Sequence, residues 1–166
     1  MSANPAAPEP LVALAPIEID LVVPCNAQRA FDYFTRDIGR WWPLATHSCA
    51  EDDAVAVAFE PCVGGRLVET ARDGTTHPWG TVFAWEPGQR VAFSWHPGRD
   101  PATAQRVDVS FRAVPAGTRV TLVHGGWEAL GERAAAAREA YLGGWATVFA
   151  HRYGDWCNGA IREGRT

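Results

Sequence analysis

Two side chains in this sequence of 166 residues could transfer protons inside an apolar environment. Glu69 follows Leu67 by two residues in a stretch where apolar and polar residues alternate, so both side chains share one face of the expected strand. His124 has the parity of Leu122 and is expected to point inward at the end of the last strand. A carboxylate or an imidazole enclosed by aromatic rings is a candidate general acid or base.

Both residues also have an ordinary interpretation. Glutamate lies mostly on outer faces, solvated or paired with an arginine, and Arg66 and Arg152 could pair with Glu69 or bind a carboxylate. A lone histidine on an apolar face is mostly hydrogen-bonded within the core, and this alternative stays open for His124. His77 is expected across a hairpin from Glu69 and reaches it only if the strand register permits.

Aromatic residues are dense in the stretch HPWGTVFAWEPGQRVAFSW (77–95), which a Pro-Gly turn divides into two strands. Aromatic side chains on strands are mostly core, but tryptophans from separate elements could also enclose space for an apolar or aromatic molecule. The residues expected to line such a pocket are Trp41, Glu69, Trp79, Phe93, Trp95, His124, Tyr141, Trp145 and Phe149.

The alternation within this stretch sorts its rings by face. On the first strand, Trp79, Phe83 and Trp85 are expected on one face, with Gly80 and Val82 on the other. Both faces of a sheet that is covered by a single helix cannot be core. One set of tryptophans is therefore expected on the outer face, near an edge, or at a bulge beside Gly80.

Several classes of function are disfavoured by what the sequence lacks. No G-x-S-x-G, P-loop, G-x-G-x-x-G or H-E-x-x-H motif is present, and the histidines are too scattered for a metal site, so we expect neither a metal nor a cofactor. A net charge of −4 argues against nucleic acid and anionic membranes as partners. Scattered cysteines, with no secretory signal and no membrane-spanning run, indicate a cytoplasmic protein with free thiols.

The elements that must position these side chains follow from the periodicity of the sequence. Two short helices are expected after the first strand, one over 27–34 with Asn26 as its N-cap and one over 37–43. A helix of about 25 residues is expected over 132–158. The strands, of which the last six form an antiparallel meander and the first joins an edge, are expected at 17–23, 55–60, 65–71, 77–86, 90–96, 106–114 and 119–124.

One long helix across one curved antiparallel sheet buries the apolar faces of both, so the predicted class is α+β. In the strand that follows the two short helices, Val55, Val57 and Phe59 are expected to share the buried face. Gly143 and Gly144 interrupt the long helix. Either they let the sheet approach closely, or they leave a flexible point over a cavity.

The order of elements and several motifs resemble a known superfamily. The motifs are AFDYFTRDIGRWWP (30–43), FEPCVGGRLVET (59–70), DGTTHPWGTVFAWEPGQRVAFSW (73–95) and YLGGWATVF (141–149). They resemble the START-like, birch-pollen-allergen-like (SRPBCC) superfamily and, within it, bacterial relatives of the activators of the heat-shock-90 ATPase. The resemblance implies a helix-grip fold, with a curved antiparallel sheet of about seven strands wrapped on a long C-terminal helix.

The resemblance covers nearly the whole chain after its first residues. A single START-like domain is expected over 17–160, between a disordered tail at 1–16 and a short tail at 161–166. Chaperone activation in the eukaryotic members depends partly on an additional N-terminal domain with an Asn- and Trp-rich motif. Nothing before Ile17 resembles that motif.

Three functions are compatible with these observations. The first is binding of a hydrophobic or aromatic small molecule, with Glu69 or His124 fixing its orientation. The second is an enzyme of the cyclase, aromatase or hydrolase kind, in which Glu69 or His124 transfers protons. The third is a chaperone-related protein that binds a partner, or a second copy of itself, through IGRWWPL (38–44). If the pair Trp41 and Trp42 is exposed, it would form that surface, and if it is buried, it would cap the pocket.

Overall fold

The computed structural model describes residues 14–162, and it has the predicted α+β helix-grip architecture. The expected tail at 1–16 lies almost wholly outside the described residues. The last helix continues to Arg162, so the chain is still helical where the C-terminal tail was expected to begin.

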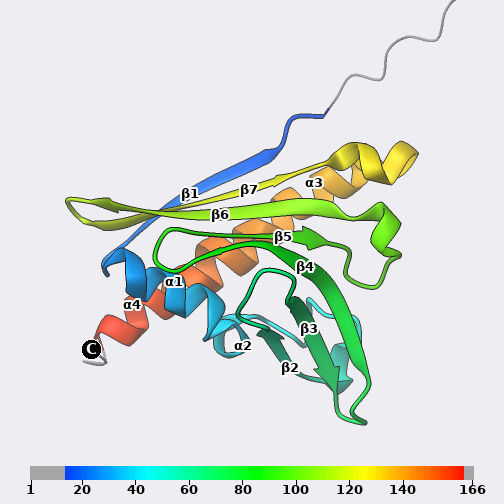
Figure 1. Ribbon diagram of the computed structural model, residues 1–166, viewed down its shortest axis with the longest axis horizontal. Helices are drawn as coiled ribbons and strands as arrows, with labels where there is room; N and C mark the ends of the chain where they lie inside the picture. The colour runs from blue at the N-terminus through cyan, green and yellow to red at the C-terminus, as the bar shows by residue number, and fades with distance from the viewer. Residues whose placement is uncertain (1–13, 163–166) are drawn as a thin grey trace, which may run out of the picture.

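Seven strands form one antiparallel sheet in the order β1-β7-β6-β5-β4-β3-β2 (Figure 1). This order confirms the meander of six strands with the first strand added beside the last, because each of β2 to β7 pairs with its neighbour in sequence. The strands are β1 (Ile17–Val23), β2 (Ala54–Phe59), β3 (Arg66–Ala71), β4 (Thr76–Glu86), β5 (Arg90–Trp95), β6 (Gln105–Val114) and β7 (Gly117–Gly125).

Two short helices follow β1, as predicted. Helix α1 (Ala27–Thr35) begins at Asn26, whose side chain accepts a hydrogen bond from the Arg29 amide at 2.9 Å. Helix α2 (Ile38–Trp41) is a single turn. The loop after it contains one 3-10 turn, η1 (Glu51–Asp53), before β2 begins.

The long helix runs across one face of the sheet, behind it in Figure 1. A 3-10 segment, η3 (Trp127–Arg133), precedes it, and the helix itself begins at Ala134, slightly later than predicted. It is continuous but not uniform: α3 (Ala134–Trp145) passes through a π-helical segment η4 (Ala146–Tyr153) into α4 (Gly154–Arg162). Such wide turns are rare and occur frequently at functional sites.

Strand β4 departs from simple alternation at two bulges, which correct the predicted faces. Gly80 pairs with Leu67 while Pro78 pairs with the next residue of β3, so Trp79 is an extra residue on β4 and points inward. A second bulge lies at Phe83, which is 49% exposed. Trp79 and Trp85 therefore pack on the core side although Phe83, predicted on the same face, does not.

The bulge at Trp79 depends on a close approach of two strands. A Cβ atom at Gly80 would overlap the carbonyl oxygen of Ser94 on β5, so only glycine fits there. Strand β2 contains a similar irregularity after Ala54, which leaves Val55 exposed while Val57 is buried. The prediction that Val55 shares the buried face was wrong for this reason.

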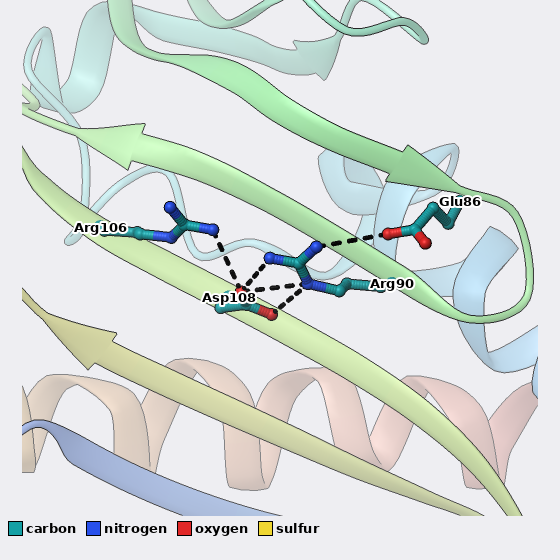
Figure 2. A network of polar contacts seen from close by, with 4 residues as sticks. All are labelled: Glu86, Arg90, Arg106 and Asp108. Atoms are coloured by element: carbon teal, nitrogen blue, oxygen red, sulfur yellow. Dashed lines mark hydrogen bonds and ion pairs between the residues drawn. The ribbon is translucent and has the colours of Figure 1, made fainter.

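The outer face of the sheet carries a network of charges that pair with one another (Figure 2). Arg90 lies 2.6 Å from Asp108 and 3.4 Å from Glu86, and Arg106 lies 3.6 Å from Asp108. Asp108 alternates along β6 with two buried valines, which places it opposite the helix. Each arginine of this network has a carboxylate as its partner.

The inner face of the sheet, α1, α2 and the long helix enclose a single apolar core. Cys25 and Cys157 are buried in it, Cys49 is half-buried and Cys62 is exposed, all as free thiols. No helix within residues 14–162 is long and apolar enough to cross a membrane.

Candidate functional site

A cavity of about 350 Å³ lies between the long helix, the sheet and the loop after α2. This volume falls in the range of small-molecule sites. The wall is formed by Trp42, His47, Ser48, Cys49, Trp79, Trp95, Pro97, Gly98, Tyr141, Gly144, Trp145 and Val148.

Trp42 occupies the middle of the aromatic wall. Helix α2 ends at Trp41, and Trp42 follows it with an extended backbone (ψ 126°), its ring centroid 5.8 Å from that of Trp41. The ring centroid lies 5.0 Å from that of Trp79, 5.9 Å from that of Trp95 and 6.0 Å from that of Trp145. Its indole N–H donates to the His47 carbonyl at 2.7 Å, which holds the ring against the loop.

Glu69 points inward, as predicted, but it does not line the cavity. Its fully buried carboxylate accepts hydrogen bonds from the amides of Cys49 at 2.7 Å and Ala50 at 2.8 Å, and from the Trp79 indole at 3.0 Å. These three N–H donors satisfy both oxygens of the carboxylate. Glu69 therefore holds the loop that forms one wall of the cavity and has no oxygen aimed at its interior.

His124 is also fully buried and is fixed by two polar partners. The Trp145 indole N–H donates to Nδ1 at 2.9 Å, so in the neutral ring Nε2 carries the proton and donates to Gln105 Oε1 at 3.3 Å. Its ring stacks on Trp127 at 4.2 Å. Burial, and secondarily the charge of Arg99, lower the pKa of His124 to about 3, so the ring is neutral at physiological pH.

The remaining predicted residues divide between the cavity wall and the core. Trp79, Trp95, Tyr141 and Trp145 line the cavity. Trp41, Phe93 and Phe149 are buried in the core and are not part of its wall. Trp41 instead donates its indole N–H to the Tyr33 carbonyl at 2.8 Å.

The two arginines considered as partners for Glu69 have other contacts. Arg66 pairs with Glu60 at 2.9 Å, and Arg152 donates to the Trp41 carbonyl at 2.9 Å. His77 pairs directly with Glu69 in the β3–β4 register, as predicted, although no hydrogen bond joins the two side chains among residues 14–162.

The pair Trp41 and Trp42 is buried, with exposed fractions of 1% and 7%. It therefore does not form the exposed surface that the partner-binding hypothesis requires. Of the two alternatives for this pair, the structure has the buried one, and Trp42 alone of the pair forms part of the pocket wall. The prediction chose Trp41 for the wall, whereas Trp42 lies there.

Sequence reasoning also missed the loop residues His47, Ser48 and Cys49 and the turn residues Pro97 and Gly98. The signal for the turn was its place directly after Trp95, at the end of a strand whose alternate residues point inward. The loop had no periodic pattern, and its position depends on hydrogen bonds to a residue about twenty positions away.

Gly143 and Gly144 do not serve close packing. A Cβ atom at either position would meet no heavy atom within 4 Å outside its own helix backbone. Gly144 lines the cavity and Gly143 is exposed. The position of Gly144 agrees with the alternative that placed the glycines over a cavity, and that of Gly143 does not.

Two polar atoms of the wall are buried without a hydrogen-bond partner. They are the indole nitrogen of Trp95 and the hydroxyl oxygen of Ser48. Buried polar groups are nearly always satisfied, so each unpaired one calls for an explanation. Both atoms are shielded from the cavity as well as from solvent, so a ligand in the cavity pairs with them only after the neighbouring side chains shift.

Comparisons with known proteins agree with this architecture. Residues 24–151 match the family described as Activator of Hsp90 ATPase homolog 1-like protein. No curated protein is significantly similar to the chain.

Three solved structures represent the similarities. The anthrahydroquino-γ-pyrone synthase Txn09, complexed with SUM, is 31% identical over 75% of this chain and 84% of its own, with a TM-score of 0.53. The AHSA1-like protein from Aeromonas hydrophila is 19% identical over 91% of this chain and 95% of its own, with a TM-score of 0.57. ChR145 from Cytophaga hutchinsonii is 12% identical over 92% of this chain and 99% of its own, with a TM-score of 0.64.

The last two similarities concern the fold alone, because their identities are low. The family match covers most of the chain and agrees with the sheet order and the long C-terminal helix described above. The chain belongs to the family of Activator of Hsp90 ATPase homolog 1-like proteins, within the START-like superfamily.

Proposed function

We propose that this protein binds a flat, largely apolar aromatic molecule in the cavity between the long helix and the sheet. The observation that carries the proposal is the wall itself, in which Trp42, Trp79, Trp95, Tyr141 and Trp145 surround about 350 Å³ of space. Aromatic rings offer a large contact area and stack on flat ligands. A water-filled space with such a wall would be unfavourable, and an aromatic ligand would replace that water.

The orientation of the ligand is assigned differently from the prediction. Glu69 and His124 are fully engaged by other protein groups and lie outside the wall. The Trp95 indole N–H and the Ser48 hydroxyl are the buried unpaired polar groups on wall residues. A ligand oxygen that accepts from Trp95 would satisfy a buried donor that is otherwise unpaired.

The proposal is tested by filling the cavity from the helix. Gly144→Leu places a side chain in the cavity, whereas Gly143→Leu places the same side chain on the exposed side of the same helix turn. We expect Gly144→Leu to weaken binding of an uncharged naphthalene probe by about tenfold or more, on the basis of lost cavity volume, and Gly143→Leu to leave it unchanged. Tryptophan fluorescence quenching measures the affinity. Equal binding by both variants, or no binding by the wild type, would contradict the proposal.

A second candidate function is a cyclase-like enzyme acting on a polycyclic aromatic substrate. The observation that favours it is the 31% identity to a protein named anthrahydroquino-γ-pyrone synthase. Proton transfer would then require a group that touches the cavity. His47 is such a group: Thr46 Oγ1 lies 2.8 Å from its Nδ1, and its Nε2 makes no hydrogen bond within the described part of the chain.

The enzyme hypothesis is separated from simple binding by product analysis. Wild-type protein incubated with a polycyclic aromatic polyketide should change the mass or the absorption spectrum of the substrate. His47→Ala should abolish this conversion, while Glu69→Gln and His124→Ala act only through stability. Binding without conversion by the wild type would leave the protein a binding module.

A further inference from the structure

Arg99 does not line the aromatic cavity but contacts one of its wall residues. It follows Gly98, which is part of the wall, and its side chain is partly buried. The guanidinium Nη2 donates to the hydroxyl of Tyr141, a wall residue, at 2.8 Å, and the guanidinium carbon lies 6.0 Å from the Tyr141 ring centroid. These contacts join the turn after β5 to the long helix on the side of the cavity that Gly98 and Tyr141 line, which is called the cavity mouth below.

The charge of Arg99 has no counterion within residues 14–162, because no carboxylate lies within ion-pair distance of it. The neighbouring Asp100 uses its carboxylate to accept from the Ala102 amide at 2.8 Å. The Arg99 Nε atom is buried and makes no hydrogen bond. On the outer face of the sheet, by contrast, Arg90 and Arg106 share the carboxylate of Asp108 (Figure 2).

The unpaired charge of Arg99 affects the ionisation of a buried residue close to the cavity. The positive charge of Arg99 contributes, after burial, to the lowered pKa of His124, which lies beneath Tyr141 at a centroid distance of 4.9 Å. The wall contains no aspartate or glutamate, and the nearest buried carboxylate, Glu69, is satisfied by three N–H donors. The electrostatic environment of the cavity mouth therefore favours an anion.

We propose, building on the function proposed above, that the aromatic ligand carries an anionic oxygen, from a carboxylate or an ionised phenol, which binds Arg99 at the cavity mouth. The guanidinium presents several N–H donors in one plane and suits such an oxygen. Tyr141 supports the contact, because its oxygen accepts from Arg99 and its own O–H is free to donate to the ligand. The rings of the ligand lie on the tryptophans beyond.

The test compares two probes of equal shape, naphthoate and its uncharged counterpart naphthamide, by calorimetric titration. A hydrogen bond to a charged group contributes enough that wild-type protein should bind naphthoate about tenfold or more tightly than naphthamide. Arg99→Gln should remove this preference by weakening naphthoate alone, and Arg99→Lys should retain part of it. Arg106→Gln, which removes a positive charge from the outer face, is the matched control and should keep the preference.

A third probe, a dinitronaphthol that is ionised at neutral pH, separates the two sources of the anionic oxygen. If Arg99→Gln weakens naphthoate more than the dinitronaphthol, the site prefers a carboxylate. If it weakens the dinitronaphthol more, the site prefers an ionised phenol. Equal affinity of the wild type for naphthoate and naphthamide would overturn this inference and leave the proposed function standing. An equal loss of both probes in Arg99→Gln would overturn it too, because Arg99 would then only support the wall. If neither probe binds the wild type, the proposed function fails and this inference fails with it.

Discussion

The aromatic side chains beneath the long helix fall into two groups that pack differently, called the closed end and the open end. The closed end consists of Phe34, Trp41, Phe149 and Tyr153, and the open end consists of Trp42, Trp79, Trp95, Tyr141 and Trp145. At the closed end Phe149 stacks on Tyr153 at 5.6 Å, and Phe34 meets Tyr153 edge-on at 5.3 Å. At the open end similar ring distances surround a cavity of about 350 Å³.

The difference shows that aromatic content alone does not separate a core from a binding site. At the closed end the polar atoms are paired within the protein: the Trp41 indole donates to the Tyr33 carbonyl and the Tyr153 hydroxyl to the Ala30 carbonyl, at 2.8 and 2.7 Å. At the open end Trp95 keeps an unpaired indole N–H. The unpaired Trp95 nitrogen distinguishes the open end, whereas the π-helical segment does not, because it begins directly after Trp145 and contains Phe149 and Tyr153 of the closed end.

The largest expected effect is the difference in stability lost when an aromatic side chain of each end is replaced by alanine. Phe34→Ala removes a ring that is in contact with five other aromatic side chains and should lower the free energy of unfolding by about 3–5 kcal/mol. Tyr141→Ala removes a partly exposed ring beside an existing cavity and should cost about 1 kcal/mol. Urea unfolding of both variants measures the two costs. Similar costs would mean that the open end is packed as tightly as the closed end.

The next effect concerns the loop that forms one wall of the open end. Glu69→Gln keeps the shape of the side chain but replaces one acceptor oxygen by an NH₂ group that faces N–H donors of Cys49, Ala50 or Trp79. We expect a loss of about 1.5–3 kcal/mol in the free energy of unfolding, together with faster amide hydrogen exchange in the loop. Hydrogen exchange that remains slow at Cys49 and Ala50 would show that the loop is held by other contacts.

A smaller effect is the pH dependence that His124 gives to the open end. Because the folded-state pKa is about 3 and the ordinary value is 6.5, the unfolded chain binds a proton between these values that the folded chain does not. Stability from this residue is complete above pH 6.5 and is lost as the pH falls toward 3, by about 1.4 kcal/mol per pH unit.

The measurement compares urea unfolding of the wild type and of His124→Gln at pH 7 and pH 5.5. The variant lacks the imidazole and should lose less stability on acidification, since the carboxylates titrate alike in both proteins. The same loss in both proteins would contradict the assigned role of His124. The closed end contains no histidine, so its packing should not contribute to the difference.

Features that depend on neighbouring residues in the sequence could be predicted, whereas features that depend on contacts between distant residues could not. Strand β6 alternates buried Val107 and Val109 with the outward Asp108, and the prediction of its faces is confirmed because pleating alone decides it. The faces of β4 were not predictable, because two bulges shift the alternation. A bulge beside Gly80 was one of the predicted alternatives and is confirmed at Trp79, where Gly80 approaches β5, whereas the second bulge, at Phe83, was not predicted.

The choice between Trp41 and Trp42 has a similar cause. The helix ends between the two residues, and although their ring centroids are only 5.8 Å apart, Trp42 alone reaches the cavity wall. The loop 47–49 was likewise outside the reach of periodicity, since backbone N–H groups that bind Glu69 are the same for every residue type. The fold was therefore predictable from patterns, whereas the wall of the cavity required the tertiary contacts.

The smallest expected effect uses the paired glycines of the long helix. Gly143→Ala and Gly144→Ala each replace a helical glycine whose added methyl group would meet no heavy atom within 4 Å. Each should therefore raise the free energy of unfolding by about 0.5–1 kcal/mol, measured by urea unfolding, through helix propensity alone. Only Gly144→Ala places its methyl group in the wall of the open end, so the two variants should be equally stable while Gly144→Ala alone weakens binding of an aromatic probe. If Gly143→Ala is stabilising and Gly144→Ala is not, the helix at Gly144 is constrained by the π-helical turn that follows. The open end would then be shaped by the helix backbone as well as by its aromatic side chains.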